Sequence, residues 1–227
     1  METSTSQIDV ALFDGPRLIG KKSSAENQKT AAVITPLIAQ VLAESSLSPQ
    51  QIDAVALSIG PGSFTGLRIG CVTAKVWSFA LDRPIIAVQT HEAIATQACH
   101  FGAGPAKKIW VCTDAHRQQL FVSSWNFNAT ESEFASLDPV NVCDPKEFIE
   151  QINAEDLITG EGLKKLPAAL AAELLATRTP ADVWRAKASV IGEIALRKFA
   201  IGEFADPMTL KPLYIRPSAA EEKARLG

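Results

Sequence analysis

A stripe of small residues along a segment with almost no charge constrains the fold of this chain more than any other feature. In the stretch SIGPGSFTGLRIG, Gly62, Gly66 and Gly70 stand four residues apart, and Ala74 and Ser78 continue the spacing. Residues four apart share one face of a helix, so the pattern predicts a helix from about residue 63 to 81. Glycine inside a helix costs about 1 kcal/mol relative to alanine. We therefore expect another backbone to pack closely against this face.

The rest of this helix and the segment before it are apolar on nearly every side. Arg68 and Lys75 are the only charged residues of the predicted helix at 63–81. A second helix is predicted over 29–44, KTAAVITPLIAQVLAE, with Pro36 inside it and no charge after its first residue until Glu44. Helices of this kind must be buried on most sides. Two such helices indicate an intermolecular surface, formed with another copy or a partner; the alternative is that a second lobe covers both.

The order of the remaining segments predicts an α/β protein with mixed sheets. Short apolar runs typical of strands flank the two helices, and a hairpin is expected after residue 6. After the loose segment GAGPAKK at 102–108 the chain alternates strand-like runs with helices, the last helix expected over 181–201. We therefore predict an N-terminal lobe over 1–102 and a C-terminal lobe over 103–227, with the 181–201 helix packing back on the first lobe.

Composition excludes several classes of protein. The 227 residues are 47% hydrophobic with a net charge of −3, which is typical of a globular chain without a broad nucleic-acid footprint. The sequence has no uncharged apolar run long enough to span a membrane, so we expect a soluble, cytoplasmic protein. Four cysteines, never closer than 13 residues, predict free buried thiols and not disulfides or metal ligands.

The residues that catalysis would need are missing from the sequence. The three histidines form neither H-x-x-x-H nor H-E-x-x-H, and no G-x-S-x-G elbow is present. Around His116, the segment TDAHRQQLFV predicts a structural turn with Asp114 and Arg117; a cleft constellation is the alternative. The glycine loop fits neither the P-loop nor the dinucleotide-binding spacing. We predict no catalytic residue, no metal and no cofactor.

Several segments together resemble one family. The chain is similar to TsaB, also called YeaZ, in GPGSFTGLRIG at 60–70 with the apolar strand before it, and in ETST at 2–5. Further similar segments are PIIAVQTHEAIA at 84–95, CTDAHRQQLFVSSW at 112–125 and LKPLYIRP at 210–217. The glycine block is shared in part with the catalytic relative TsaD. That relative carries an H-x-x-x-H metal motif and a longer chain, both missing here.

The resemblance implies a fold and a set of partners. It implies an actin-like (ASKHA) two-lobed fold and a non-catalytic subunit that binds TsaD as a heterodimer through its two N-terminal helices. It also implies TsaE in a larger complex, a homodimer when TsaD is absent, and only indirect contact with tRNA. The process is threonylcarbamoylation of the adenosine beside the anticodon in tRNAs that read ANN codons. The residues expected at the TsaD interface are Ile34, Leu37, Ile38, Val41, Gly66, Gly70, Ala74 and Trp77.

Two points depart from the resemblance or compete with it. Relatives begin with a strand such as ILALDTS, whereas here Met1 directly precedes Glu2 and Thr3, so we expect the first, central strand to be truncated. We expect Met1 to be an internal position of a longer protein or a misassigned start. The competing function is a nucleotide-dependent enzyme of the actin and hexokinase type. In that case the residues that face the phosphates would be Thr3, Ser4, Gly60, Gly62 and Ser63.

Overall fold

The computed structural model describes residues 1–100, 108–128, 133–168 and 178–216. The chain forms two compact units. The N-terminal unit contains Met1–Ala93 and Ala186–Leu213, and the second unit contains Ile94–Arg185 and the chain from Tyr214 onward. The lobe boundary predicted at 102/103 lies outside the described residues, and the contacts divide the chain elsewhere, inside one helix and at two later points.

The N-terminal unit is built from two pairs of strands covered by helices. β1 pairs with β2 in an antiparallel hairpin, and β3 pairs with β4 in parallel. Its elements are β1 (Asp9–Asp14), β2 (Arg17–Ser23), α1 (Thr30–Glu44), the short 3₁₀ turn Pro49–Gln51, β3 (Val55–Ser58), α2 (Phe64–Leu81), β4 (Ile85–Val88), the start of α3 (Thr90–His100), and α6 (Ala188–Ala200).

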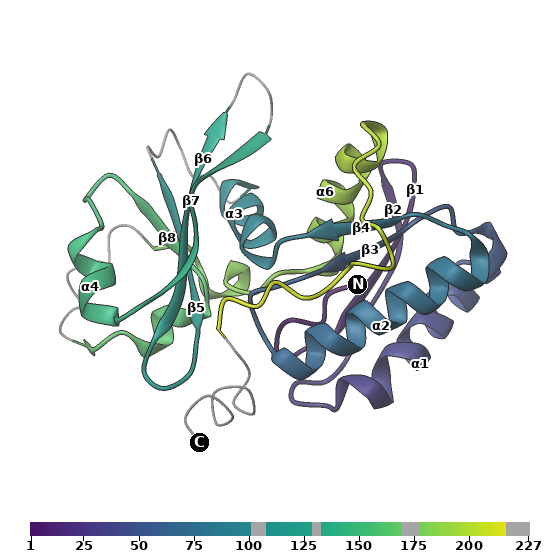
Figure 1. Ribbon diagram of the computed structural model, residues 1–227, viewed down its shortest axis with the longest axis horizontal. Helices are drawn as coiled ribbons and strands as arrows, with labels where there is room; N and C mark the ends of the chain where they lie inside the picture. The colour runs from purple at the N-terminus through teal and green to yellow at the C-terminus, as the bar shows by residue number, and fades with distance from the viewer. Residues whose placement is uncertain (101–107, 129–132, 169–177, 217–227) are drawn as a thin grey trace. The chain divides into compact units, whose positions relative to one another are not determined.

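Helices cover both faces of these strands. α1 packs on β1 and β2, α2 packs on β3 and β4, and the two helices contact each other, while α6 contacts β1, β3 and β4. Figure 1 shows the strands lying between α6 on one side and α1 with α2 on the other. The apolar side chains of α1 that face the strands form one core cluster with Ile8 and Val10 of the β1 segment. A second cluster joins β3 and β4 to Cys71 and Ala74 of α2.

Local sequence explains where α2 begins and ends. The Ser63 hydroxyl oxygen accepts a hydrogen bond from the Gly66 N–H at 3.2 Å, which satisfies one of the free donors of the first turn. At the other end Asp82 takes the left-handed conformation with φ of 54°, and its N–H bonds to the Ser78 carbonyl before Pro84. The helix predicted over 63–81 is thereby confirmed. α1 is also confirmed, and it continues through Pro36 without interruption.

The second unit is centred on a mixed four-stranded sheet in the order β7-β6-β5-β8. β5 is antiparallel to β6 and parallel to β8, and β6 is antiparallel to β7. The mixed sheets predicted from the sequence are confirmed. The elements are β5 (Ile109–Asp114), β6 (Leu120–Asn128), β7 (Glu133–Cys143), α4 (Pro145–Glu150), β8 (Leu157–Thr159) and the 3₁₀ turns Glu161–Lys165 and Ala181–Val183.

The helix predicted over 181–201 is wrong in its first part. Residues 181–183 form only a 3₁₀ turn after Pro180, and α6 begins at Ala188. The Trp184 indole N–H donates to the Thr179 carbonyl at 3.0 Å, which holds this segment in a turn that a continuous helix would break. All four cysteines carry free thiols; Cys71, Cys112 and Cys143 are buried as predicted, and Cys99 is only half-buried. Within the described ranges no helix is long and apolar enough to cross a membrane.

Candidate functional site

The loop from Ser58 to Ser63 is held against the start of the chain. The Ser63 N–H donates to the Ser4 carbonyl at 2.7 Å, and the Thr90 N–H donates to the Gly60 carbonyl at 2.8 Å. Gly62 has a φ of 154° and faces Ser4 so closely that a β-carbon would overlap the Ser4 carbonyl oxygen. This loop is therefore packed backbone to backbone on Ser4.

The residues proposed to face a nucleotide are buried or hydrogen-bonded within the fold. Thr3 is 0% exposed and Ser4 is 4% exposed. The amide and hydroxyl of Ser63 are engaged with Ser4 and Gly66, so these two groups are not aimed at a bound anion. Thr3, Ser4, Gly62 and Ser63 lie together where the chain start meets α2, whereas the Gly60 carbonyl accepts from the Thr90 N–H. The structure gives no support to a phosphate cradle.

The stripe of small residues on α2 contacts the same chain start. A β-carbon on Gly66 would overlap the Thr3 carbonyl oxygen, and one on Gly70 would overlap the Thr3 hydroxyl. Ala74 and Ser78 are buried on the same face. The predicted close approach of a backbone is confirmed, and that backbone belongs to the chain itself.

A buried carboxyl lies beside this contact. Glu2 is 0% exposed and accepts hydrogen bonds from both the N–H and the hydroxyl of Ser4. Burial raises the pKa of Glu2 from its ordinary value of 4.5 to about 7, although the hydrogen bonds from Ser4 and Ser58 act in the opposite direction. Near neutral pH this carboxyl is therefore held partly protonated.

This carboxyl makes stability depend on pH. Between about pH 4.5 and pH 7 the folded chain keeps the Glu2 proton while the unfolded chain releases it, so stability falls as the pH rises. Between pH 4.5 and pH 7 the free energy of unfolding of the wild type should therefore fall by about 3 kcal/mol more than that of Glu2→Gln. Urea unfolding of both proteins at pH 4.5 and pH 7.5 measures the difference. An equal change in the free energy of unfolding of the two proteins between these pH values would show that the pKa of Glu2 is not raised in the folded chain.

The opposite face of α2 is apolar and exposed. Its spacing of four, four and three residues places Arg68, Val72, Val76 and Phe79 in line, with Phe64 at the start and the Arg68 guanidinium 5.2 Å from the Phe64 ring centre. Val72, Val76 and Phe79 are 60%, 59% and 63% exposed. We call Phe64, Val72, Val76 and Phe79 the α2 stripe. Exposed apolar groups gathered in this way mark an interaction surface.

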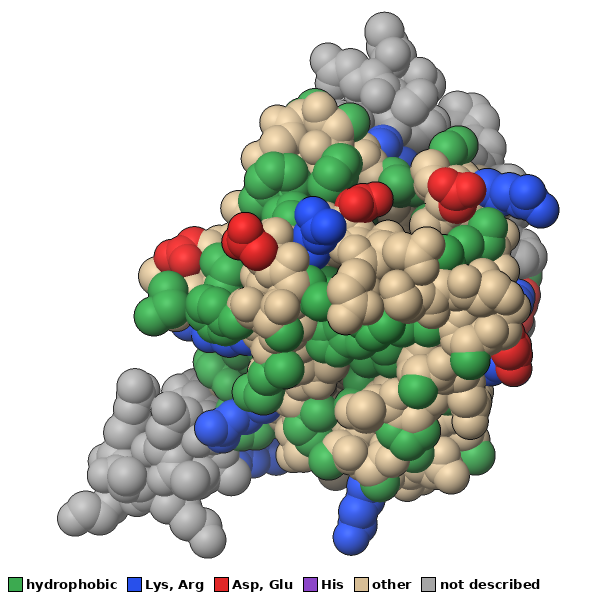
Figure 2. All heavy atoms as spheres, turned by 90° about the vertical axis from the view of Figure 1, so that its right-hand side faces the viewer, with side chains coloured by type: hydrophobic (Ala, Val, Ile, Leu, Met, Phe, Trp, Pro, Cys, Tyr) green, Lys and Arg blue, Asp and Glu red, His purple; other side chains and the backbone are tan. Residues whose placement is uncertain are grey.

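The outer face of α1 continues this surface with small, uncharged residues. Ala32, Thr35, Ala39 and Ala43 are exposed, and α1 lies beside α2. Figure 2 shows the right-hand side of the molecule as seen in Figure 1, where apolar side chains gather in the middle and charged ones lie mainly along the upper part and the edges. Small side chains let another helix approach closely, so α1 and the α2 stripe form one face suited to helix packing.

The interface residues predicted from the sequence do not lie on this face. Their side chains fill the core of the N-terminal unit, because they stand on the sides of α1 and α2 that face the strands and the chain start. The buried residues of this set are Ile34, Leu37, Ile38, Val41, Gly66, Gly70 and Ala74. Trp77 is half-buried and packs against both core clusters. The exposed stripe was present in the sequence as the bulky face opposite the glycines, which is the signal that would have identified it.

The segment around His116 forms a tight turn in the second unit. His116, Arg117 and Gln118 all take positive φ values, and the Asp114 carboxylate accepts from the His116 N–H at 2.8 Å and pairs with Lys165 at 3.4 Å. The turn predicted here is confirmed. Among the residues that the structure describes, no group of three or more histidine, cysteine or acidic side chains could hold a metal.

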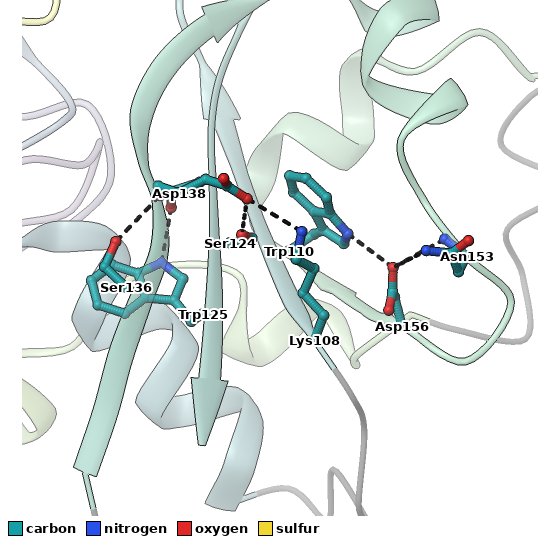
Figure 3. A network of polar contacts seen from close by, with 9 residues as sticks. Lys108, Trp110, Ser124, Trp125, Ser136, Asp138, Asn153 and Asp156 are labelled. Carbon is teal, nitrogen blue, oxygen red and sulfur yellow. Dashed lines mark hydrogen bonds and ion pairs between the residues drawn. The ribbon is translucent and has the colours of Figure 1, made fainter. Parts of the chain in front are cut away.

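A polar network ties β5 to the rest of the second unit (Figure 3). The buried Trp110 indole N–H donates to the Asp156 carboxylate at 3.0 Å, and the Asn153 N–H donates to the same oxygen at 3.0 Å. Lys108 lies 4.3 Å from the Trp110 ring and pairs with Asp138 at 3.2 Å. Each of these groups is paired with another residue of the second unit, which indicates that the network stabilises the fold.

Removing the Asp156 carboxylate should destabilise this unit. Asp156→Ala leaves the Trp110 indole N–H and the Asn153 N–H without their acceptor, at a cost of about 1–3 kcal/mol. Chemical unfolding measures the loss, and the loss should shrink in a Trp110→Phe background, where one donor is absent. A change within about 0.5 kcal/mol in the wild-type background would contradict a structural role for the network.

Comparison with known proteins agrees with this fold. A sequence model of the family described as "TsaD: tRNA N6-adenosine threonylcarbamoyltransferase" matches residues 24–186. Two proteins named tRNA threonylcarbamoyladenosine biosynthesis protein TsaB are 26% identical over 98% of this chain. They come from Haemophilus influenzae, with 94% of its length covered, and from Escherichia coli, with 96% covered.

A solved structure shows the same architecture. YeaZ from Pseudomonas aeruginosa superposes with a TM-score of 0.77 at 22% identity, over 93% of this chain and 97% of that one. The α/β fold of actin-like type predicted from the sequence is therefore confirmed. The chain belongs to the family of the tRNA N6-adenosine threonylcarbamoyltransferase TsaD, and its full-length relatives assign it to the TsaB (YeaZ) group.

Proposed function

We propose that this chain is a non-catalytic subunit that binds TsaD and activates it for threonylcarbamoylation of the adenosine next to the anticodon in ANN-decoding tRNAs. The observation that carries the proposal is the exposed, almost uncharged face made by α1 and the α2 stripe. The names of its relatives link them to tRNA threonylcarbamoyladenosine biosynthesis, and a cytoplasmic location suits that process.

The size of the face suits a stable helical interface. α2 has 18 residues and is therefore ~27 Å long. With α1 beside it, the surface is of the order of the ~800 Å² per partner found in specific complexes. The uncharged outer side of α1 can be desolvated without leaving an unpaired charge, which favours a helix pair of TsaD as the occupant.

The remaining partners in this proposal are those that the resemblance to TsaB implies. TsaE joins the TsaD complex, tRNA contacts this subunit only indirectly, and the net charge of −3 is consistent with a basic tRNA surface supplied by another subunit. When TsaD is absent, two copies of this chain cover the same face in a homodimer.

A reconstituted modification assay tests the proposal. TsaD, TsaE and a source of threonylcarbamoyl-AMP are incubated with ANN-decoding tRNA, with and without this chain, and the modified adenosine is quantified. We expect modification to depend on the chain and the chain alone to show no ATP turnover. Modification at the same rate without the chain would refute the activator role, and substantial ATP turnover by the chain alone would favour the nucleotide-dependent enzyme.

A further inference from the structure

Arg68 is the charged residue in the line of exposed side chains on α2. It follows Phe64 by one turn and precedes Val72 by one turn, and its guanidinium lies 5.2 Å from the centre of the Phe64 ring. All three of these side chains are exposed. A partner that covers the α2 stripe therefore also covers the guanidinium of Arg68.

The charge of Arg68 is not neutralised within the part of the chain that the structure describes. There Arg68 contacts the Phe64 ring but makes no ion pair. A guanidinium over a ring stays charged, and its N–H donors still need acceptors. In the free chain water supplies them, because the side chain is exposed. A partner that displaces this water must supply acceptors of its own.

Other charged residues near this face already have partners of opposite charge. Lys75, the second cation of α2, is half-buried and interacts electrostatically with the Asp206 carboxylate. Glu44, at the end of α1, pairs with Lys22 at 2.7 Å. The outer side of α1 before Glu44 carries no charge. The face made by α1 and the α2 stripe therefore presents one uncompensated positive charge, at Arg68.

We propose that this face selects a TsaD helix that carries a carboxylate opposite Arg68, and that the resulting ion pair favours TsaD over a second copy of the chain. The inference rests on the proposed function and names the chemistry of the partner surface. An arginine and a carboxylate can form two parallel hydrogen bonds, so one Asp or Glu neutralises the charge and satisfies two donors. Contact with the Phe64 ring orders the guanidinium before binding, which lowers the entropy lost on pairing.

A second copy of the chain offers no such carboxylate at the centre of the face. In a two-fold dimer the same face meets itself, so each Arg68 meets side chains of α1 and α2 from the other copy. Residues 31–43 and 64–80 of these helices include no Asp or Glu. Asp82 is exposed and lies beyond the end of α2, at the rim of the face, where an ion pair contributes little. A homodimer therefore covers Arg68 without neutralising it.

Arg68→Met tests the ion pair, because methionine keeps a long apolar side chain and removes the charge. Titration calorimetry should show a dissociation constant for TsaD that rises at least ~30-fold, since the TsaD carboxylate loses its counter-charge. Sedimentation equilibrium of the chain alone should show a homodimer at least ~10-fold tighter, since an unpaired cation leaves each side of the interface. Arg197→Met, the same change at an exposed arginine of α6, should alter neither constant.

A double-mutant cycle identifies the carboxylate. Each exposed Asp and Glu of TsaD is replaced by Asn or Gln, and one replacement should weaken binding of the wild-type chain at least ~10-fold more than binding of Arg68→Met. Equal affinity of TsaD for the wild-type chain and Arg68→Met, or a homodimer weakened by Arg68→Met, would overturn the inference. A wild-type chain that does not bind TsaD in the same titration would instead refute the proposed function, and this inference with it.

Discussion

Replacing Val72 and Val76 by glutamate is expected to weaken association with TsaD at least ~100-fold and to leave the fold of the chain intact. Both side chains are more than half exposed in the α2 stripe, so glutamate remains hydrated in the free chain. In the complex the two carboxylates would be buried in an apolar interface, where Arg68, one turn before position 72, is a single cation and cannot neutralise both, so burial is strongly unfavourable. Titration calorimetry with TsaD measures the affinity, and thermal unfolding checks the fold.

A matched control lies elsewhere on the same unit. Ile201→Glu introduces a charge at an apolar residue that is 74% exposed and lies just beyond the end of α6. This variant should bind TsaD as the wild type does. If the Val72 and Val76 double variant kept wild-type affinity, the α2 stripe would not be the contact surface.

Replacing Gly66 by alanine is expected to destabilise the N-terminal unit by at least ~3 kcal/mol, although the same change stabilises an ordinary exposed helix by about 1 kcal/mol. The added β-carbon would overlap the carbonyl oxygen of Thr3, and neither backbone can move without breaking the hydrogen bond between Ser63 and Ser4. Chemical unfolding monitored by circular dichroism measures the change.

Gly202→Ala provides the comparison for a glycine with open space around it. Gly202 has a φ of 74° and no neighbouring atom within 4 Å of a β-carbon, so alanine there should cost only about 1 kcal/mol of conformational strain. A Gly66→Ala protein as stable as the wild type would show that the small-residue face of α2 has room to spare.

The sequence predicted the elements of the N-terminal unit better than it predicted which way they face. Periodicity located α1 and α2, and the glycine spacing required a close backbone contact, because glycine inside a helix is otherwise unfavourable. The same spacing could not identify the neighbour. Thr3 fills that role through contacts across more than 60 residues of sequence, which no local pattern reports.

The burial of the residues predicted at the interface follows from this limit. Ile34 and Val41 have the apolar character of interface residues, but the strands bury them, whereas Val72 and Phe79 have similar character and remain exposed. Only the position of the sheet distinguishes the two sets. The predicted helix over 181–201 failed for a related reason, since the Trp184 indole and the Thr179 carbonyl stabilise a turn that helix propensity does not anticipate.

Association with TsaD tests the central claim most directly. Purified chain and TsaD are mixed at ~10 μM each, a concentration well above the dissociation constant expected for a specific interface of this size. The molar mass is then measured by light scattering after size-exclusion chromatography. We predict a single species with one copy of each protein, replacing any homodimer of the chain. Separate elution of the two proteins at their unmixed masses would contradict the account.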